Sequence, residues 1–302
     1  MIFILTLFSG LTLILFVLSI SLFFMIFEER NFFKNNRKKE DSKTSNCSFT
    51  YHLMYEGHLP RSLFIACISQ LIVSLFIPMG TLPQFISTSA DIFIIVFLML
   101  LAHGLYIRGV KSFSKDRYQS MENKEVNLLF NFAIVLLIVG GTFSWYILNR
   151  GLPGYIFSID AYSAMPLWRV TGLFGKAGLV LFFILLSIAS PGRKISRLCA
   201  NGVIRLSDIF EAVSPTICSA IIVAMFMPHK IGIALGFTGV TMFTIDYSCF
   251  WIEVFFLQII ISPLIKNHYL KYKVKIPYNF NLLPAILVGL FGFLFMMMDL
   301  YL

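Results

Sequence analysis

The chain has 302 residues, of which 58% are apolar and only 13% are charged, and its formal net charge is +9. Soluble domains have about half apolar and about a quarter charged residues, so this composition excludes an ordinary soluble domain and indicates a protein dissolved in lipid. Basic residues of a membrane protein first mark the orientation of its loops, so the positive charge does not indicate nucleic-acid binding.

A membrane-spanning helix requires about 20 mainly apolar residues. About eight such runs follow one another and predict an all-α, polytopic membrane protein with a single transmembrane domain. In chain order the runs cover residues 3–27, 62–82, 90–110, 126–148, 170–190, 209–227, 236–262 and 279–300. The first run is uncharged and lacks the features of a secretory signal, so we expect it to be retained as a span. Pro215 and Pro284 lie inside runs, where a missing N–H group predicts a kink.

The connection between the sixth and seventh runs, residues 228–230, is very short. It predicts either a tight hairpin or a partly re-entrant pair of helices. Gly232, Gly236 and Gly239 follow this connection. We interpret them as a small-residue face that allows close helix contact.

Lysine and arginine are distributed unequally over the connections between runs. Twenty of the 24 lie in the connections 28–61, 108–124, 193–205 and 266–275, and the other four are Arg150, Arg169, Lys176 and Lys230. Positively charged loops stay in the cytoplasm. We therefore expect residues 28–61 to form a basic cytoplasmic loop, and both termini to lie outside the cytoplasm.

Two acidic residues lie within the seventh run. A charged group at the centre of a span costs about 2.5–3.5 kcal/mol on insertion scales, so it persists only where it faces protein or water. Asp246 and Glu253 are seven residues apart, which is two helical turns, so both carboxylates are expected on one face. Asp246 lies near mid-membrane and Glu253 in the cytoplasmic third. Such a pair is typical of a proton or Na⁺ path.

Four further polar residues lie at related depths and are candidates for the same ion path. His103 lies in the cytoplasmic third of the third run, and Glu125 and Glu211 open the fourth and sixth runs. Asp91 begins the third run at its outer end. The alternative interpretation treats the three acids as helix-end residues in headgroup water, since acids favour helix N-termini, and His103 as a packing residue.

The sequence contains no cofactor or nucleophile motif. Its five cysteines include no CxxC pair, and no second histidine lies at the depth of His103 to form a haem-ligand pair. Nucleotide-binding, zinc-protease and serine-hydrolase motifs do not occur. We therefore expect this chain to contribute no catalytic residue and to bind no metal or cofactor itself.

Three stretches carry motifs of a known family. The first holds Ile77-Pro78-Met79-Gly80, the aspartate-headed span at Asp91, the segment Gly109 to Tyr118, and the pair Lys124-Glu125. The second holds Phe226-Met227-Pro228, Asp246-Tyr247 and Trp251-Ile252-Glu253, and the third is Leu53 to Arg61. They resemble the third span with its loop, the seventh span, and the segment before the second span of the subunit 1 family of respiratory complex I (NADH dehydrogenase). The resemblance is closest to the membrane-anchor subunit of energy-converting, membrane-bound NiFe hydrogenases.

This resemblance implies a membrane-embedded subunit of an oxidoreductase complex in a prokaryotic cell membrane. Such a subunit anchors the redox arm and contributes to a proton or Na⁺ path. The implied partners are membrane lipids, antiporter-like membrane subunits, and hydrogenase-like large and small subunits that carry the NiFe centre and iron–sulfur clusters. By position, Asp91, Glu125 and Asp246 fall on polar positions of the family's membrane interior.

The chain departs from the family pattern in several places. The acidic loop after the fifth span is absent, and only the basic segment 191–208 joins the spans. Lys124 replaces the arginine of an Arg-Glu pair, Glu253 stands where a basic residue is expected, and the first loop lacks its Arg-Gly-Pro pattern. Two alternatives stay open: a structural or assembly scaffold without an ion path, and a stand-alone secondary transporter.

Overall fold

The computed structural model describes residues 15, 17–21, 61–79, 91–113, 126–152, 156–164, 167–191, 206–228, 230–261 and 282–302. Within these ranges the regular structure is helical and contains no strand beyond one isolated bridge. The long helices are α2 (Arg61–Leu75), α3 (Ile92–Phe113), α5 (Val126–Asn149), α8 (Leu173–Ala189), α9 (Leu206–Phe226), α11 (Gly239–Phe256) and α13 (Leu282–Tyr301). The shorter ones are α6 (Ile159–Ala164), α7 (Leu167–Val170), α10 (Ile231–Ala234) and the π-helix η2 (Leu257–Ile261), which continues α11.

Four helical stretches in the described ranges are long and apolar enough to cross a membrane. They are Ile92–Gly109, Leu129–Asn149, Ile209–Phe226 and Gly239–Ile261. Three further apolar helices, in α2, α8 and α13, are shorter. The described chain is therefore all-helical and contains candidate membrane spans, as predicted. The first apolar run is described only at residue 15 and residues 17–21, so the total of about eight spans stays a prediction.

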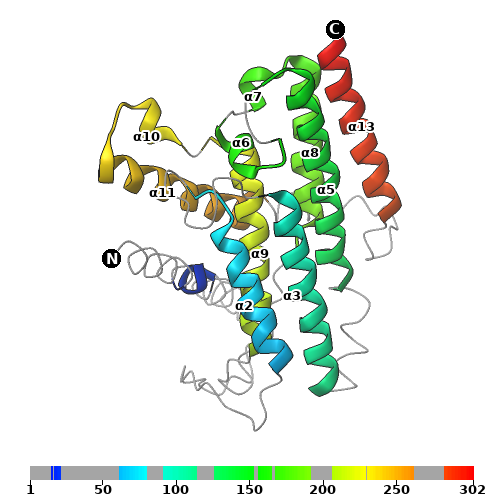
Figure 1. Cartoon of the computed structure of the whole chain (residues 1–302), viewed down its shortest axis with the longest axis vertical. Coiled ribbons are helices and arrows are strands. Elements are labelled where there is room, and N and C mark those ends of the chain that lie inside the picture. Colours follow the sequence, from blue (N-terminus) through cyan, green and yellow to red (C-terminus); the bar gives the residue numbers. More distant parts are fainter. Residues whose placement is uncertain are drawn as a thin grey trace, which may run out of the picture.

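In the body of the molecule α9 lies near the centre, and α2, α3, α5, α8 and α13 lie alongside one another around it (Figure 1). Helix α9 contacts α2, α3, α6, α8, α11 and η2, and 89% of the residues in its apolar stretch are buried. Near the top of Figure 1 the start of α8 meets the ends of α5 and α13. We call this the upper end.

At the opposite, lower end, the start of α2 lies against the end of α3, where Gly109 approaches Leu63. Arg61 and Arg108 lie at this lower end. Arg150, Arg169 and Lys176 belong to the upper-end helix termini. The basic residues that the sequence assigns to opposite sides of the membrane thus lie at opposite ends of the molecule, as spans of alternating direction require. Which end faces the cytoplasm, and where the termini lie, stay predictions from the loop charges.

Helix α11 departs from this arrangement. Figure 1 shows it extending sideways from α9 beyond the other helices, steeply inclined to α9, with α10 beside its outer end. Only 33% of the residues in an 18-residue apolar stretch within Gly239–Ile261 are buried. The connection from α9 to α11 comprises residues 227–238 and contains α10. Of the two alternatives for residues 228–230, the tight hairpin is therefore wrong, because a helical turn and a second bend separate the two helices.

The predicted glycine face is also wrong, because two of its three glycines are turn residues. Gly236 and Gly239 have φ angles of +75° and +64°, a left-handed conformation that side chains disfavour. The N–H of Phe237 donates to the carbonyl of Gly232 at 3.1 Å, which closes α10 as a Schellman motif around Gly236. Gly232 alone makes a close helix contact, since a Cβ there would lie 3.0 Å from Asp246.

Two helix bounds and one predicted kink differ from the sequence predictions, each near a proline or glycine. Helix α2 ends at Leu75 because Pro78 disfavours helical backbone in the preceding residue. Helix α8 begins at Leu173, after an extended Gly172 that separates it from α7. Pro284 lies in the first turn of α13, where its missing N–H group has no helical partner, so no kink is required there.

Candidate functional site

Asp246 lies in the middle of α11 and is fully buried, with 0% of its surface exposed. Its Oδ1 accepts a hydrogen bond of 2.5 Å from the backbone N–H of Gly232 in α10. Its Oδ2 is buried and has no hydrogen-bond partner among the described residues. One carboxylate oxygen is thus fixed by the fold, whereas the other is open to a proton or a bound group.

Glu253 lies two turns further along the same helix. Its side chain is half-buried, and Oε2 is buried without a hydrogen-bond partner among the described residues. Cys249 lies between the two acids and is close enough to interact electrostatically with both. The structure therefore places both carboxylates along one side of α11, as their spacing predicts.

A second polar group joins α3 to α9 towards the lower end. The hydroxyl of Tyr106 donates to Oε1 of Glu211 at 2.6 Å. The Tyr106 ring stacks on Phe210 at a centroid distance of 4.3 Å and on His103 at 6.5 Å. His103 is buried. Glu211 is therefore tied to a neighbouring helix, beyond any role as a helix-end acid, and it shares this interface with His103.

A side-chain hydrogen bond links the helix of the α11 acids to the central helix α9. Gln258 of η2 donates from Nε2 to Oγ1 of Thr216 in α9, at 3.4 Å. Single π-helical turns within α-helices occur frequently at functional sites. The six residues expected in one polar file are thus divided: Asp246 and Glu253 belong to the α10–α11 region, and His103 and Glu211 to the α3–α9 interface.

The remaining two predicted residues lie apart from these groups. Asp91 precedes α3, and its Oδ1 accepts a hydrogen bond of 2.9 Å from the N–H of Phe93, the geometry of a helix N-cap. The N–H of Ile92 donates to the carbonyl of Phe157 at 3.0 Å, which fixes the start of α3 against the segment before α6. Glu125 lies outside the described residues.

Tyr162 of α6 secures the same region. Its buried hydroxyl lies 2.8 Å from Oγ of Ser144 and donates to the carbonyl of Ile156 or of Gly140, at 2.9 and 3.1 Å. Burial raises the pKa of Tyr162 to about 12, an effect reinforced by the charge of Asp91 and opposed by the hydrogen bond with Ser144. Tyr162 therefore stays neutral at physiological pH and acts as a structural hydrogen-bonding group.

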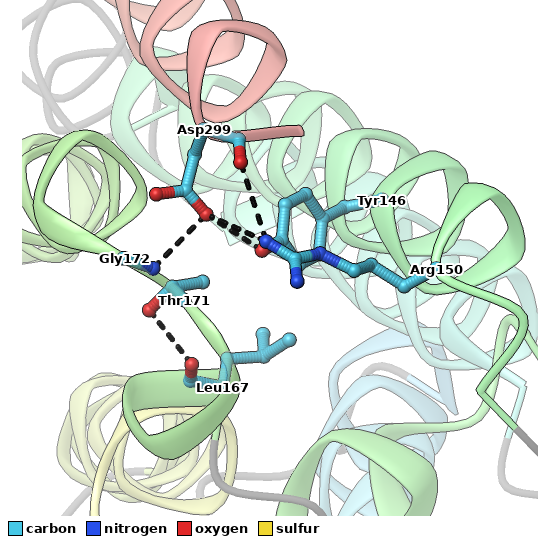
Figure 2. A network of polar contacts seen from close by, with 6 residues as sticks. All are labelled: Tyr146, Arg150, Leu167, Thr171, Gly172 and Asp299. Atoms are coloured by element: carbon cyan, nitrogen blue, oxygen red, sulfur yellow. Dashed lines mark hydrogen bonds and ion pairs between the residues drawn. The ribbon is translucent and has the colours of Figure 1, made fainter. Parts of the chain in front are cut away.

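The structure also shows a network that sequence analysis missed, centred on Asp299 of α13 (Figure 2). Its Oδ2 accepts hydrogen bonds from the hydroxyl of Tyr146 at 2.7 Å and the N–H of Gly172 at 3.0 Å, and it pairs with Arg150 at 3.3 Å. Only 4% of the Asp299 side chain is exposed, against 36% for Arg150. One carboxylate thus joins α13 to the end of α5 and the start of α8.

Two glycines make room for this carboxylate. A Cβ at Gly172 would lie 2.6 Å from Oδ1 of Asp299, and a Cβ at Gly175 would lie 2.8 Å from Oδ2. The acid therefore caps the start of α8 from another helix, where a negative charge is favoured. A signal was present in the sequence: Asp299 lies at the end of the eighth run and Arg150 just after the fourth, and both of these ends are predicted on the outer side.

Among the described residues, no group of three or more His, Cys, Asp or Glu side chains is arranged to hold a metal ion. No family model and no curated protein match this chain. The resemblance to the subunit 1 family of complex I therefore rests on the motifs quoted above. It stays a hypothesis about function.

Proposed function

We propose that the chain is a membrane-embedded subunit of a complex I-related, hydrogenase-like oxidoreductase, and that Asp246 and Glu253 form part of its proton or Na⁺ path. The observation that carries the proposal is the asymmetry of Asp246: Oδ1 is bonded to Gly232, and Oδ2 is buried without a partner among the described residues. A neutral asparagine caps a helix as well as an aspartate does. An ionisable group at this depth costs additional free energy. Capping therefore does not explain why this position holds an aspartate instead of an asparagine.

The geometry suits stepwise transfer along α11. Oδ2 of Asp246 can take up and release a proton while Oδ1 keeps its bond to Gly232. Glu253 is the next carboxylate on the same side, roughly 10 Å further along the helix axis. That separation exceeds a hydrogen bond, so transfer between the two acids requires intervening water or a side chain from a partner subunit.

The exposed side of α11 supports a position against lipid or another apolar membrane subunit. Val240 and Ile252 are 80% and 66% exposed, and both are large apolar residues. Exposed apolar surface of this kind is expected where a helix meets lipid or a membrane partner. The proposed partners are membrane lipids, antiporter-like membrane subunits and the hydrogenase-like subunits that hold the NiFe and iron–sulfur centres.

The test compares three variants in the intact complex. Asp246→Asn keeps an acceptor for the N–H of Gly232 but removes the charge. Glu253→Gln removes the second charge, further along α11. We expect both complexes to assemble and to translocate ions at least about tenfold more slowly, as removal of a proton-transfer group typically does. The matched control is Asp91→Asn, because asparagine is an equally good cap and Asp91 lies apart from α11.

Ion uptake into membrane vesicles, measured together with subunit composition, separates the proposal from its alternatives. Normal uptake by an intact Asp246→Asn complex would contradict the ion-path role. A scaffold role is favoured by the bond between Asp246 and Gly232, and it predicts that Asp246→Ala prevents assembly whereas Asp246→Asn has no effect. A stand-alone transporter predicts that mild detergent extraction yields this chain without hydrogenase-like partners.

A further inference from the structure

The interface of α2, α3 and α9 contains buried polar atoms that the described protein groups leave unbonded. Gln70 of α2 is 0% exposed, and neither its amide oxygen nor its amide nitrogen has a hydrogen-bond partner among the described residues. The Oγ of Ser214 in α9 is likewise buried without a partner in that part of the chain. Buried polar atoms are nearly always bonded to protein or to ordered water. A side chain with both amide atoms unbonded by the described residues therefore indicates a further partner, such as ordered water.

Helix geometry places Gln70 and Ser214 at the same height along the helix bundle. Ala66 and Cys67 of α2, Tyr106 of α3 and Phe210 of α9 belong to one packed cluster. Gln70 lies one turn above Ala66, and Ser214 lies one turn above Phe210, because α2 and α9 both begin at the lower end.

Helix α3 runs in the opposite direction, so His103 lies one turn above Tyr106 at this same level. Gln70, Ser214 and His103 therefore form a polar layer immediately above the pair of Tyr106 and Glu211. The layer lies on the side of that pair that faces the middle of the bundle.

We infer that this layer binds water, held by Gln70 and Ser214, which extends the polar group of Tyr106 and Glu211 towards the middle of the bundle. The amide of Gln70 offers both a donor and an acceptor, and the hydroxyl of Ser214 offers both as well, which matches the two to four polar partners that a buried water requires. Gln70 and Ser214 are both neutral, so as ligands they suit a small uncharged molecule. The inference that water binds here is independent of the proposed function, whereas a part of this water in ion transfer rests on the proposed function.

Radiolytic hydroxyl-radical labelling of the intact complex tests for bound water directly, because radicals formed from buried water modify the side chains beside it. We expect Tyr106 to be labelled severalfold faster than Tyr162, a buried tyrosine of α6 that lies apart from this layer. In Gln70→Leu, labelling of Tyr106 should fall severalfold and labelling of Tyr162 should not change. Equal labelling of the two tyrosines in the unmodified protein would overturn the inference.

Thermal unfolding gives a second measurement, because a dry interface predicts the opposite change in Tm. If the interface were dry, Gln70→Leu would remove unbonded polar atoms and raise Tm. We expect Tm to fall by about 2–4 °C, because the bound water loses its partners. Ser214→Ala, a smaller change, should shift labelling and Tm in the same directions, and a rise in Tm in either variant would overturn the inference.

Ion uptake by the same variants separates the site from the path. We expect uptake to fall in Gln70→Leu together with the labelling of Tyr106. Rapid labelling of Tyr106 in the unmodified protein, combined with normal uptake by Gln70→Leu, would refute a role of the water in the ion path but not the site. Slow labelling of Tyr106 in the unmodified protein would refute the site whatever the uptake.

Discussion

Replacing Asp299 by alanine is expected to loosen the upper end of the molecule, where this carboxylate joins three helices. The change removes the acceptor for Tyr146 and Gly172, at 2.7 and 3.0 Å. Hydrogen bonds to a charged group contribute about 1.5–3 kcal/mol each and are not additive, and a helix cap contributes about 1 kcal/mol. Because Arg150 is 36% exposed, its ion pair counts as a surface pair of about 0.2–1 kcal/mol.

These contributions lead to an expected loss of about 3–4 kcal/mol for Asp299→Ala. Asp299→Asn keeps one acceptor oxygen and the shape of the side chain, so its expected loss is about 1–2 kcal/mol. At about 2–3 °C per kcal/mol for a chain of this size, Tm should fall by roughly 6–12 °C for the alanine variant and roughly 2–6 °C for the asparagine variant. Thermal unfolding in detergent measures both values.

The order of effects among the partners tests the reasoning more sharply than any single value. Tyr146→Phe should cost about 1–2 kcal/mol, because a neutral hydroxyl bonded to a charged group is lost. Arg150→Ala should cost less than about 1 kcal/mol. The account would be refuted if Arg150→Ala lowered Tm as much as Asp299→Ala, or if Asp299→Ala changed Tm by less than about 2 °C.

Three further tests probe other contacts through the same unfolding assay. Gly236→Ala places a side chain at φ +75° and should cost about 1 kcal/mol, and an unchanged Tm would contradict the turn described. Gly109→Ala brings a Cβ to 2.5 Å from Cγ of Leu63, so Tm should fall and should recover partly when Leu63→Ala is added. Tyr106→Phe and Glu211→Gln should be coupled by about 1–2 kcal/mol in a double-mutant cycle, whereas additive effects would argue against their hydrogen bond.

Properties that depend on short stretches of chain were predictable from the sequence. Hydropathy sums over neighbouring residues, so the apolar runs indicated an all-helical membrane protein without any knowledge of packing. The common side of Asp246 and Glu253 followed from their seven-residue spacing, because helix geometry is local. The capping role of Asp91, one of its two interpretations, likewise depends on the next two residues only.

Tertiary structure alone decided which helices meet and which polar groups pair across them. Tyr106 and Glu211 are 105 positions apart, and Tyr146 and Asp299 are 153 positions apart, so no local pattern links either pair. The inclined course of α11 and its bond from Asp246 to Gly232 depend on a left-handed turn at Gly236. Between helices in lipid, apolar surface gains little by association, so close packing and hydrogen bonds choose the neighbours. Those contacts exist only once the chain is folded.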